Sequence, residues 1–221
     1  MTVWLLLLLV LQAQVDEGTF VVRDDTTEVA RETFRLSEGP IGLGRAGWRL
    51  ATRVRYDRAR PAIVLASTLE VGSDSQPLSL SFDVADPRAP LRVLGQLSRD
   101  RLTVRLLGRQ SEGAREFPVS GRAVILDDSV YALYAFPAWR AGARPVSLTA
   151  VVPRAGREET LLVEDLGLAA TTVNRDPATL RHLTLTGGAN GVVHLWLDSN
   201  GRVLKIEIPT RKVRVERRPP A

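Results

Sequence analysis

The sequence contains no cysteine, which excludes disulfides, thiolate metal sites, cysteine nucleophiles and lipidation of a mature N-terminal cysteine. Histidine is almost as scarce, with only His182 and His194. These two histidines and Asp198 could together bind a metal, but two histidines with no other well-placed ligand are weak evidence for a zinc site. We therefore expect no metal site. We also expect no cofactor. The chain also lacks the G-x-S-x-G, H-E-x-x-H and G-x-x-x-x-G-K motifs, which argues against serine-hydrolase, zinc-protease and nucleoside-triphosphate chemistry.

The sequence has a single long hydrophobic run, from Val3 to Leu11. It has about half of the roughly 20 apolar residues that a membrane span needs, and its length fits the apolar region of a signal peptide. We therefore expect a signal peptide over residues 1–13, and an uncleaved anchor is the alternative. The remainder, with 44% hydrophobic residues in the whole chain, is expected to form a single domain over 14–218 with a tail at 219–221. The expected location is periplasmic or secreted, with no membrane span after removal of the signal.

Charge is distributed unevenly. The formal net charge is +5, and the stretch 202–218, with seven basic and two acidic residues, accounts for all of it. Such a stripe could hold an anionic head group, or it could be a solvated strand face that protects a sheet edge from aggregation. We expect no nucleic-acid partner.

The stretch "HLWLDSNGRVLKIEIP" alternates between apolar and polar residues around Asn200-Gly201. This dipeptide favours a type I′ turn, whose two central residues have positive φ. Counting outward from it pairs Leu197 with Leu204 and His194 with Glu207, and all apolar pairs fall on one face. The turn and the burial pattern therefore predict the same hairpin register.

The same period of two recurs along the chain, with turn signals every 8 to 14 residues. This pattern predicts an all-β fold: a single antiparallel meander forming a curved sheet or an open half-barrel. The segment from Asp127 to Trp139 departs from the alternation, with two aspartates as candidate N-caps and Pro137 as a stop. It is expected to be the one short helix or an ordered loop.

Four segments in order carry a family resemblance: "GTFVVRD…TEVARETFRL", "ILDDSVYALY", "VSLTAVVPR" and "HLWLDSNGRVLKIEIP…VRVER". They make the chain similar to a family of uncharacterised exported bacterial β-proteins, a domain of unknown function. The resemblance implies an envelope location and a curved antiparallel sheet, in outline like the half-barrels of lipoprotein carriers. It implies no catalytic residue.

The segment before Pro137 and the basic stripe together suggest a binding function. An aromatic cluster beside a concave sheet suits an apolar or amphipathic envelope molecule such as a lipid, although the same rings could simply fill the core. The candidate ligand-binding residues are Tyr131, Tyr134, Phe136 and Trp139 at the mouth, with Arg211, Lys212 and Arg214 near a head group.

Two other classes of function stay open. A hydrolase would use Asp127 and Asp128 as an acid/base pair with His194, and it requires these groups to meet in one cleft. Helix capping explains the same aspartates without any chemistry. A structural or protein-interaction module is the remaining alternative. We expect a non-enzymatic binding protein.

Overall fold

The computed structural model describes residues 13–42, 44–119 and 121–219. The expected signal peptide therefore lies, except for Ala13, outside the described residues, as do the last two residues of the tail. The strands are β1 (Ala13–Asp24), β2 (Thr27–Ile41), β3 (Arg45–Tyr56), β4 (Ile63–Gly72), β5 (Pro77–Ala85), β6 (Leu91–Ser98), β7 (Arg101–Gly108), β8 (Glu112–Pro118), β9 (Ala123–Ile125), β10 (Val146–Val152), β11 (Arg157–Val173), β12 (Asp176–Thr186), β13 (Val192–Leu197), β14 (Val203–Ile208) and β15 (Val213–Arg217). The helical elements are η1 (Ala132–Tyr134), α1 (Ala135–Trp139) and η2 (Pro209–Arg211).

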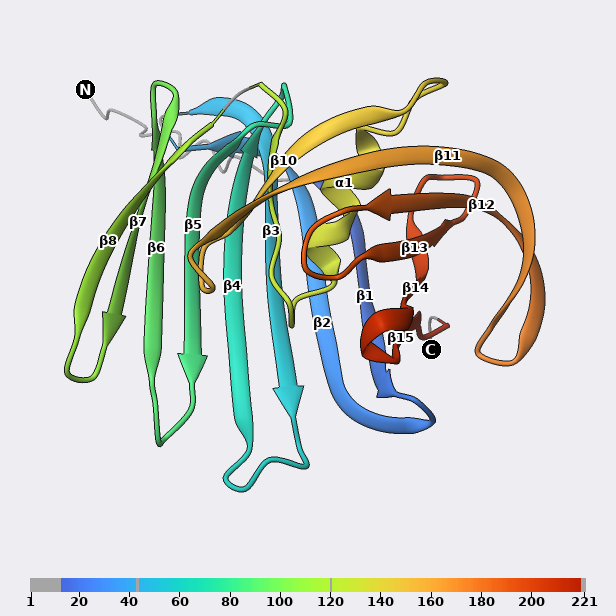
Figure 1. Cartoon of the computed structure of the whole chain (residues 1–221), viewed down its shortest axis with the longest axis horizontal. Coiled ribbons are helices and arrows are strands. Elements are labelled where there is room, and N and C mark those ends of the chain that lie inside the picture. Colours follow the sequence, from blue (N-terminus) through green and yellow to red (C-terminus); the bar gives the residue numbers. More distant parts are fainter. Residues whose placement is uncertain (1–12, 43, 120, 220–221) are drawn as a thin grey trace, which may run out of the picture.

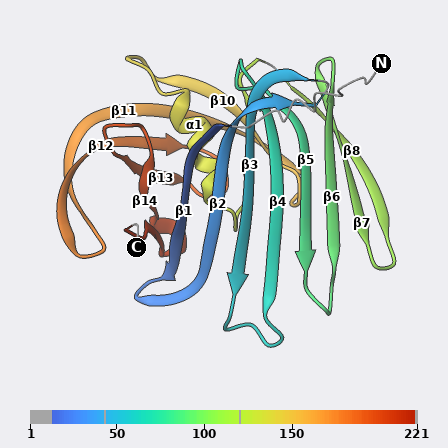
Figure 2. The same ribbon diagram turned by 180° about the vertical axis from the view of Figure 1, so that it is seen from behind.

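All fifteen strands belong to one sheet, in the order β8-β7-β6-β5-β4-β3-β2-β1-β15-β14-β13-β12-β11-β10-β9. Two meanders are thus joined where the first strand pairs with the last, and the ends of the sheet, β8 and β9, do not pair with each other. The sheet curves strongly, and α1 lies inside the curve, between β1–β3 on one side and the later strands on the other (Figure 1, Figure 2). This open, curved all-β architecture with one short α-helix confirms the predicted fold class. No helix in the described ranges is long and apolar enough to span a membrane.

One pair of strands differs from the predicted antiparallel meander. β9 runs parallel to β10, whereas every other neighbouring pair is antiparallel. Parallel neighbours need a crossover connection rather than a tight turn. The segment that contains η1 and α1 provides this crossover, so the departure from alternation seen in the sequence also marks the change in strand direction.

Alternating burial gives the sheet an apolar concave face. On β2, Ala30, Phe34 and Leu36 are buried, whereas Arg31 and Arg35 between them are exposed. The buried side chains of the strands, η1 and α1 belong to one continuous core. A period of two in the sequence therefore corresponds directly to the two faces of the sheet.

The helical segment begins differently from the prediction. Neither aspartate caps it: the backbone N–H groups of Tyr131 and Ala132 donate instead to the carboxyl oxygens of Glu32 on β2, at 2.8 and 3.1 Å. Pro137 lies inside α1 rather than ending it. Proline is tolerated there because backbone N–H groups in the first turn of a helix have no intrahelical acceptor.

The β13–β14 hairpin keeps the predicted pair of His194 with Glu207, but its turn is not type I′. Only Gly201 has a positive φ, of 75°, and its N–H donates to the carbonyl of Asp198, so a type I turn is followed by a glycine bulge. Leu197 pairs with Val203 instead of Leu204. The Asp198 carboxylate explains the change, because it accepts the N–H groups of Asn200 and Arg202, both at 2.9 Å.

Candidate functional site

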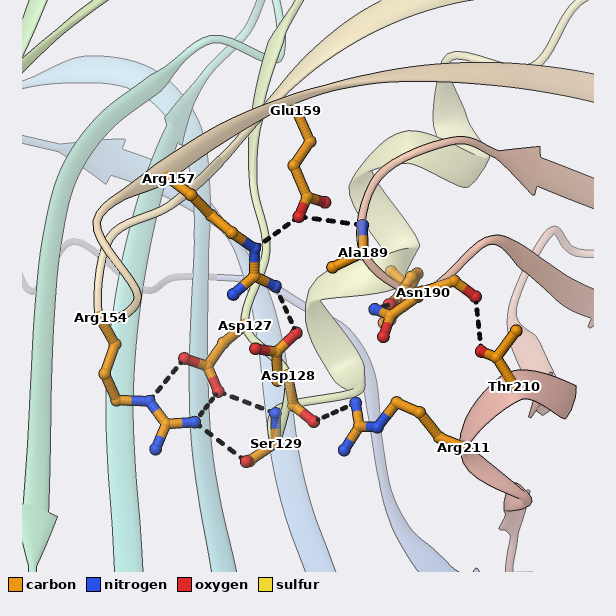
Figure 3. Close-up of polar contacts among 11 residues, drawn as sticks. Asp127, Asp128, Ser129, Arg154, Arg157, Glu159, Ala189, Asn190, Thr210 and Arg211 are labelled. Carbon is orange, nitrogen blue, oxygen red and sulfur yellow. Dashed lines mark hydrogen bonds and ion pairs between the residues drawn. The ribbon is translucent and has the colours of Figure 1, made fainter.

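The two aspartates expected as an acid/base pair are held in an arginine network (Figure 3). Arg154 binds Asp127 through two hydrogen bonds, of 2.9 and 2.8 Å, and donates to the Ser129 hydroxyl at 2.9 Å. Asp127 also accepts the N–H of Ser129. Since Asp127 is buried, this bidentate pair joins the segment before η1 to the β10–β11 turn as a structural contact.

Asp128 belongs to the same network through a different arginine. Arg157 donates to its carboxylate at 2.7 Å and also binds Glu159, which accepts the N–H of Ala189 (Figure 3). Burial opposes ionisation, but the hydrogen bond from Arg157 outweighs it and holds the pKa of Asp128 below its ordinary value. A carboxylate kept ionised by a tight partner is a poor general acid. Among the described residues, no hydrogen bond or ion pair links His194 to either aspartate.

The predicted aromatic residues fall into two groups. Tyr131, Tyr134 and Phe136 are each 2% exposed and belong to the core. Burial raises the pKa of both tyrosine hydroxyls far above the ordinary value, so neither is a proton donor or acceptor near neutral pH. Trp139 is only partly buried and packs edge-on against Trp48, with ring centroids 5.1 Å apart. Trp139 lines the inner hollow described below, whereas Tyr131, Tyr134 and Phe136 do not.

The three basic residues predicted near a head group, Arg211, Lys212 and Arg214, do not lie beside Trp139 in the inner hollow. Arg211 donates to the backbone carbonyl of Asp128 at 2.8 Å (Figure 3). Lys212 occupies a left-handed turn after η2, and Arg214 pairs with Glu207 at 3.2 Å. None of the three lines either hollow described below.

The two histidines lie on one face of the adjacent strands β12 and β13, where His182 pairs with Trp196 and Thr184 with His194. His182 Nε2 is 3.0 Å from His194 Nδ1, and the His182 ring stacks on Trp196 with centroids 4.8 Å apart. Burial and then the neighbouring His194 lower the pKa of His182. The described residues contain no group of three or more metal-ligating side chains, and Asp198 binds Arg202 instead.

A hollow of about 310 Å³ lies between the buried face of β1 and β2 and the helical elements η1 and α1. Its apolar walls come from five elements, β1, β2, η1, α1 and β14, through Val15, Phe20, Phe34, Leu36, Ala132, Ala135, Trp139 and Val203. We call it the inner hollow. Its polar lining comes from Asp16 and the β13–β14 turn, so most of the hollow is lined by apolar side chains and polar groups are few.

The inner hollow adjoins a larger, open cleft of about 1280 Å³, the outer cleft. Val15, Asp16, Phe34 and Arg202 line both. The two meet because β15 is short: β1 pairs with it only over Phe20–Asp24, so residues 13–19 of β1 have a described strand partner on the β2 side alone. A gap is therefore left in the wall between the start of β1 and β14.

Arg217 occupies this gap. Its guanidinium binds the Asp16 carboxylate, at 3.0 Å for one of the two hydrogen bonds, and lies 5.2 Å from the centroid of the Phe34 ring. Gly18 makes room for it, since a Cβ atom at that position would lie 2.9 Å from the arginine Nε. The arginine thus lies between the inner hollow and the outer cleft, over an aromatic ring that lines both.

The far end of the β11–β12 hairpin forms another wall of the outer cleft. Val173, Asn174 and Asp176 line it, and the Asn174 amide donates to the carbonyl of Arg217 at 2.7 Å. Lys205 on β14 donates to Thr171 at 3.0 Å. The hairpin is therefore fastened across the outer face of β14 and β15.

Five arginines line the outer cleft: Arg35, Arg53, Arg202, Arg217 and Arg218. Three of them belong to the basic stripe of residues 202–218, but they are not Arg211, Lys212 and Arg214, which the sequence predicts near a head group. Arg35 and Arg53 were missed altogether, because a single arginine on an alternating strand carries no local signal. Only the pairing of β2 with β3 brings them to the cleft.

These features define a class of protein, an open barrel-like β-sheet that encloses one short helix and leaves a gap in its wall. The chain is similar to a crystal structure from Brucella abortus of a beta-barrel-like protein of the domain of unknown function DUF1849. The identity is 13%, the match covers 95% of each chain and the TM-score is 0.50. This likeness concerns the fold and agrees with the expected resemblance to β-proteins of unknown function. No family model and no curated protein matches the sequence.

Proposed function

We propose that the protein is a non-enzymatic exported envelope protein that binds an apolar or amphipathic molecule in the inner hollow. The observation that carries the proposal is the junction of an apolar hollow with an open, arginine-lined cleft at a gap in the sheet. Ligand sites are typically concave and mostly apolar with a few polar groups, and have about 300–1,000 Å³. The inner hollow has these properties, at the lower end of that range.

The aspartate network supports the non-enzymatic part of the proposal. Asp127 and Asp128 are each bound by an arginine, and the two histidines contact one another instead. The apolar run at residues 3–11 supports export. Trp139 is the residue carried forward from the predicted aromatic site, now with Phe34 and Ala135 around it.

A filling substitution tests binding. The protein, purified without detergent, is titrated with the neutral probe N-phenyl-1-naphthylamine, whose fluorescence rises in apolar surroundings. We expect saturable binding by the wild type and at least a tenfold loss in Ala135→Phe, because the added ring occupies the hollow. Ala114→Phe on the exposed strand β8 is the matched control and should bind like the wild type. Absence of binding by the wild type, or equal binding by Ala135→Phe, would refute the proposal.

Export is tested separately. The full chain is expressed with its own N-terminus in a bacterial host, and the protein in the periplasmic fraction is weighed by intact mass spectrometry. We expect a mass that lacks about the first 13 residues. A full-length protein confined to the cytoplasm would contradict the envelope location without affecting the binding result.

A further inference from the structure

A line of four polar side chains crosses the sheet beside the outer cleft. Thr33 on β2 pairs with Arg53 on β3 and, on its other side, with Thr19 on β1. The backbone N–H of Arg218, directly after β15, donates to the carbonyl of Thr19 at 2.8 Å. Two hydroxyl-bearing residues thus lie between two arginines, and all four line the cleft.

The two arginines at the ends of this line differ from the other arginines of the cleft. Arg35, Arg202 and Arg217 each form an ion pair, with Glu17, Asp198 and Asp16 respectively. The guanidinium groups of Arg53 and Arg218 form no hydrogen bond or ion pair with any residue in the described ranges, and both side chains are exposed. Both can therefore bind an anion without giving up a hydrogen bond or ion pair to a described residue.

The charge of the cleft favours the same kind of ligand. Its lining carries five arginines against three carboxylates, those of Asp16, Glu17 and Asp176. Two of the three carboxylates are already paired with arginines of the cleft. The field that remains is positive, and a cleft lined mainly by one sign of charge concentrates ligands of the opposite sign.

We propose that the ligand is an anionic amphiphile with a single hydrocarbon chain. Its carboxylate or phosphate head group binds Arg53 and Arg218, with the Thr19 hydroxyl as a further donor, and its chain enters the inner hollow past Arg217. This inference rests on the proposed function and names its substrate class. A methylene group has about the volume of a water molecule, roughly 30 Å³, so the inner hollow holds one chain of about ten carbons.

Two ligands of equal chain length and opposite charge test the inference. Dodecyl phosphate and dodecyltrimethylammonium are each titrated, below their micelle concentrations, against protein loaded with N-phenyl-1-naphthylamine. We expect the phosphate to displace the probe at concentrations at least tenfold lower than the ammonium compound. The difference should shrink as salt is added, since exposed charges are screened over about 10 Å at 0.1 M. Dodecanoate in place of dodecyl phosphate distinguishes a carboxylate from a phosphate head group.

Variants locate the head group. Arg53→Gln with Arg218→Gln should reduce the preference for the anion to less than threefold and leave affinity for the neutral probe unchanged. Arg58→Gln with Arg109→Gln is the matched control, because it removes two exposed arginines that do not line the cleft. The control should keep the full preference.

The outcomes separate this inference from the proposed function. Equal displacement by both charges, or an unchanged preference in the Arg53 and Arg218 variant, would overturn the anionic head group and leave the binding function intact. Displacement by inorganic phosphate alone, as effective as by dodecyl phosphate, would overturn the requirement for a chain. Failure of the wild type to bind the neutral probe would refute the binding function itself.

Discussion

Two arginine-rich regions of the molecule differ in what their guanidinium groups contact. Around Asp127 and Asp128, the arginines donate to carboxylates or to a backbone carbonyl of the chain itself. In the outer cleft, Arg53 and Arg218 have no such partner among the described residues. The first region holds two parts of the fold together, whereas the second leaves charge available to a ligand. The number of arginines in a region is therefore less informative than the number already neutralised.

Among the substitutions, removal of Arg154 should give the largest effect on stability. Arg154→Met leaves the buried Asp127 carboxylate without its bidentate partner, and an unpaired buried charge costs several kcal/mol. Because the arginine is itself partly exposed, we expect a loss of about 2–3 kcal/mol in the free energy of unfolding. Denaturant titration measures it, with Arg58→Met as the surface control. Equal stability of the two variants would contradict the structural role of the network.

Glu32 makes the same region sensitive to pH. Burial raises the pKa of this carboxyl to about 8, and the charge of Asp127 adds to the shift. The folded state then holds a proton that the unfolded state releases near pH 4.5. Stability that is present below that pH is therefore lost as the pH rises to about 8.

The expected difference in the free energy of unfolding between pH 6 and pH 9 is up to about 3 kcal/mol, since the proton is lost over roughly two pH units at about 1.4 kcal/mol each. Denaturant titrations at both values measure it, and Glu32→Gln should remove most of the difference because glutamine does not ionise. An equal pH dependence in the variant would assign the effect to another group.

Asp16→Asn removes the ion pair of one arginine of the cleft, Arg217, which keeps its hydrogen bond to the backbone carbonyl of Glu17. Arg217 loses its ion pair at the gap, and we expect a loss of about 1 kcal/mol in the free energy of unfolding. Affinity for dodecyl phosphate should increase severalfold, since a third guanidinium becomes available to the anion. Probe displacement measures this, and an unchanged affinity would show that Arg217 does not contribute to head-group binding.

The smallest effect on stability is expected for Arg53→Gln with Arg218→Gln. Exposed residues without partners contribute little, so the free energy of unfolding should stay within about 0.5 kcal/mol of the wild type. Denaturant titration of the same preparations used for binding checks it. A loss above about 1 kcal/mol would mean that these arginines support the fold, and the contrast between the two regions would fail.

The fold class could be predicted from the sequence because alternation is a local property. The period of two and the turn signals were enough for a curved, open all-β sheet with one short helix, and the pair of His194 with Glu207 followed from the hairpin. The turn type was wrong since it depends on the Asp198 side chain. A turn with two positive φ values does form, at Asn174-Arg175, where no glycine marks it.

The site could be predicted only in outline. The basic stripe and the aromatic segment before Pro137 are visible in the sequence, but most of the residues that line the inner hollow and the outer cleft are other ones. The sequence does not distinguish an aromatic residue that fills the core, such as Tyr131 or Tyr134, from one that lines the hollow, such as Trp139. Only the tertiary packing places the two tyrosines in the core. The gap exists because β15 covers just part of β1, a pairing between the two ends of the chain that no local pattern specifies.

The pairing of β1 with β15 also has a consequence for the order of folding. Each meander forms between neighbours in the sequence, and such contacts close short loops quickly. The junction of the two meanders, in contrast, joins Phe20 to Arg217 across almost the whole chain. The first strand must therefore wait until β15 has been synthesised before the sheet becomes continuous, and we expect a nascent chain to hold its meanders unjoined until that point.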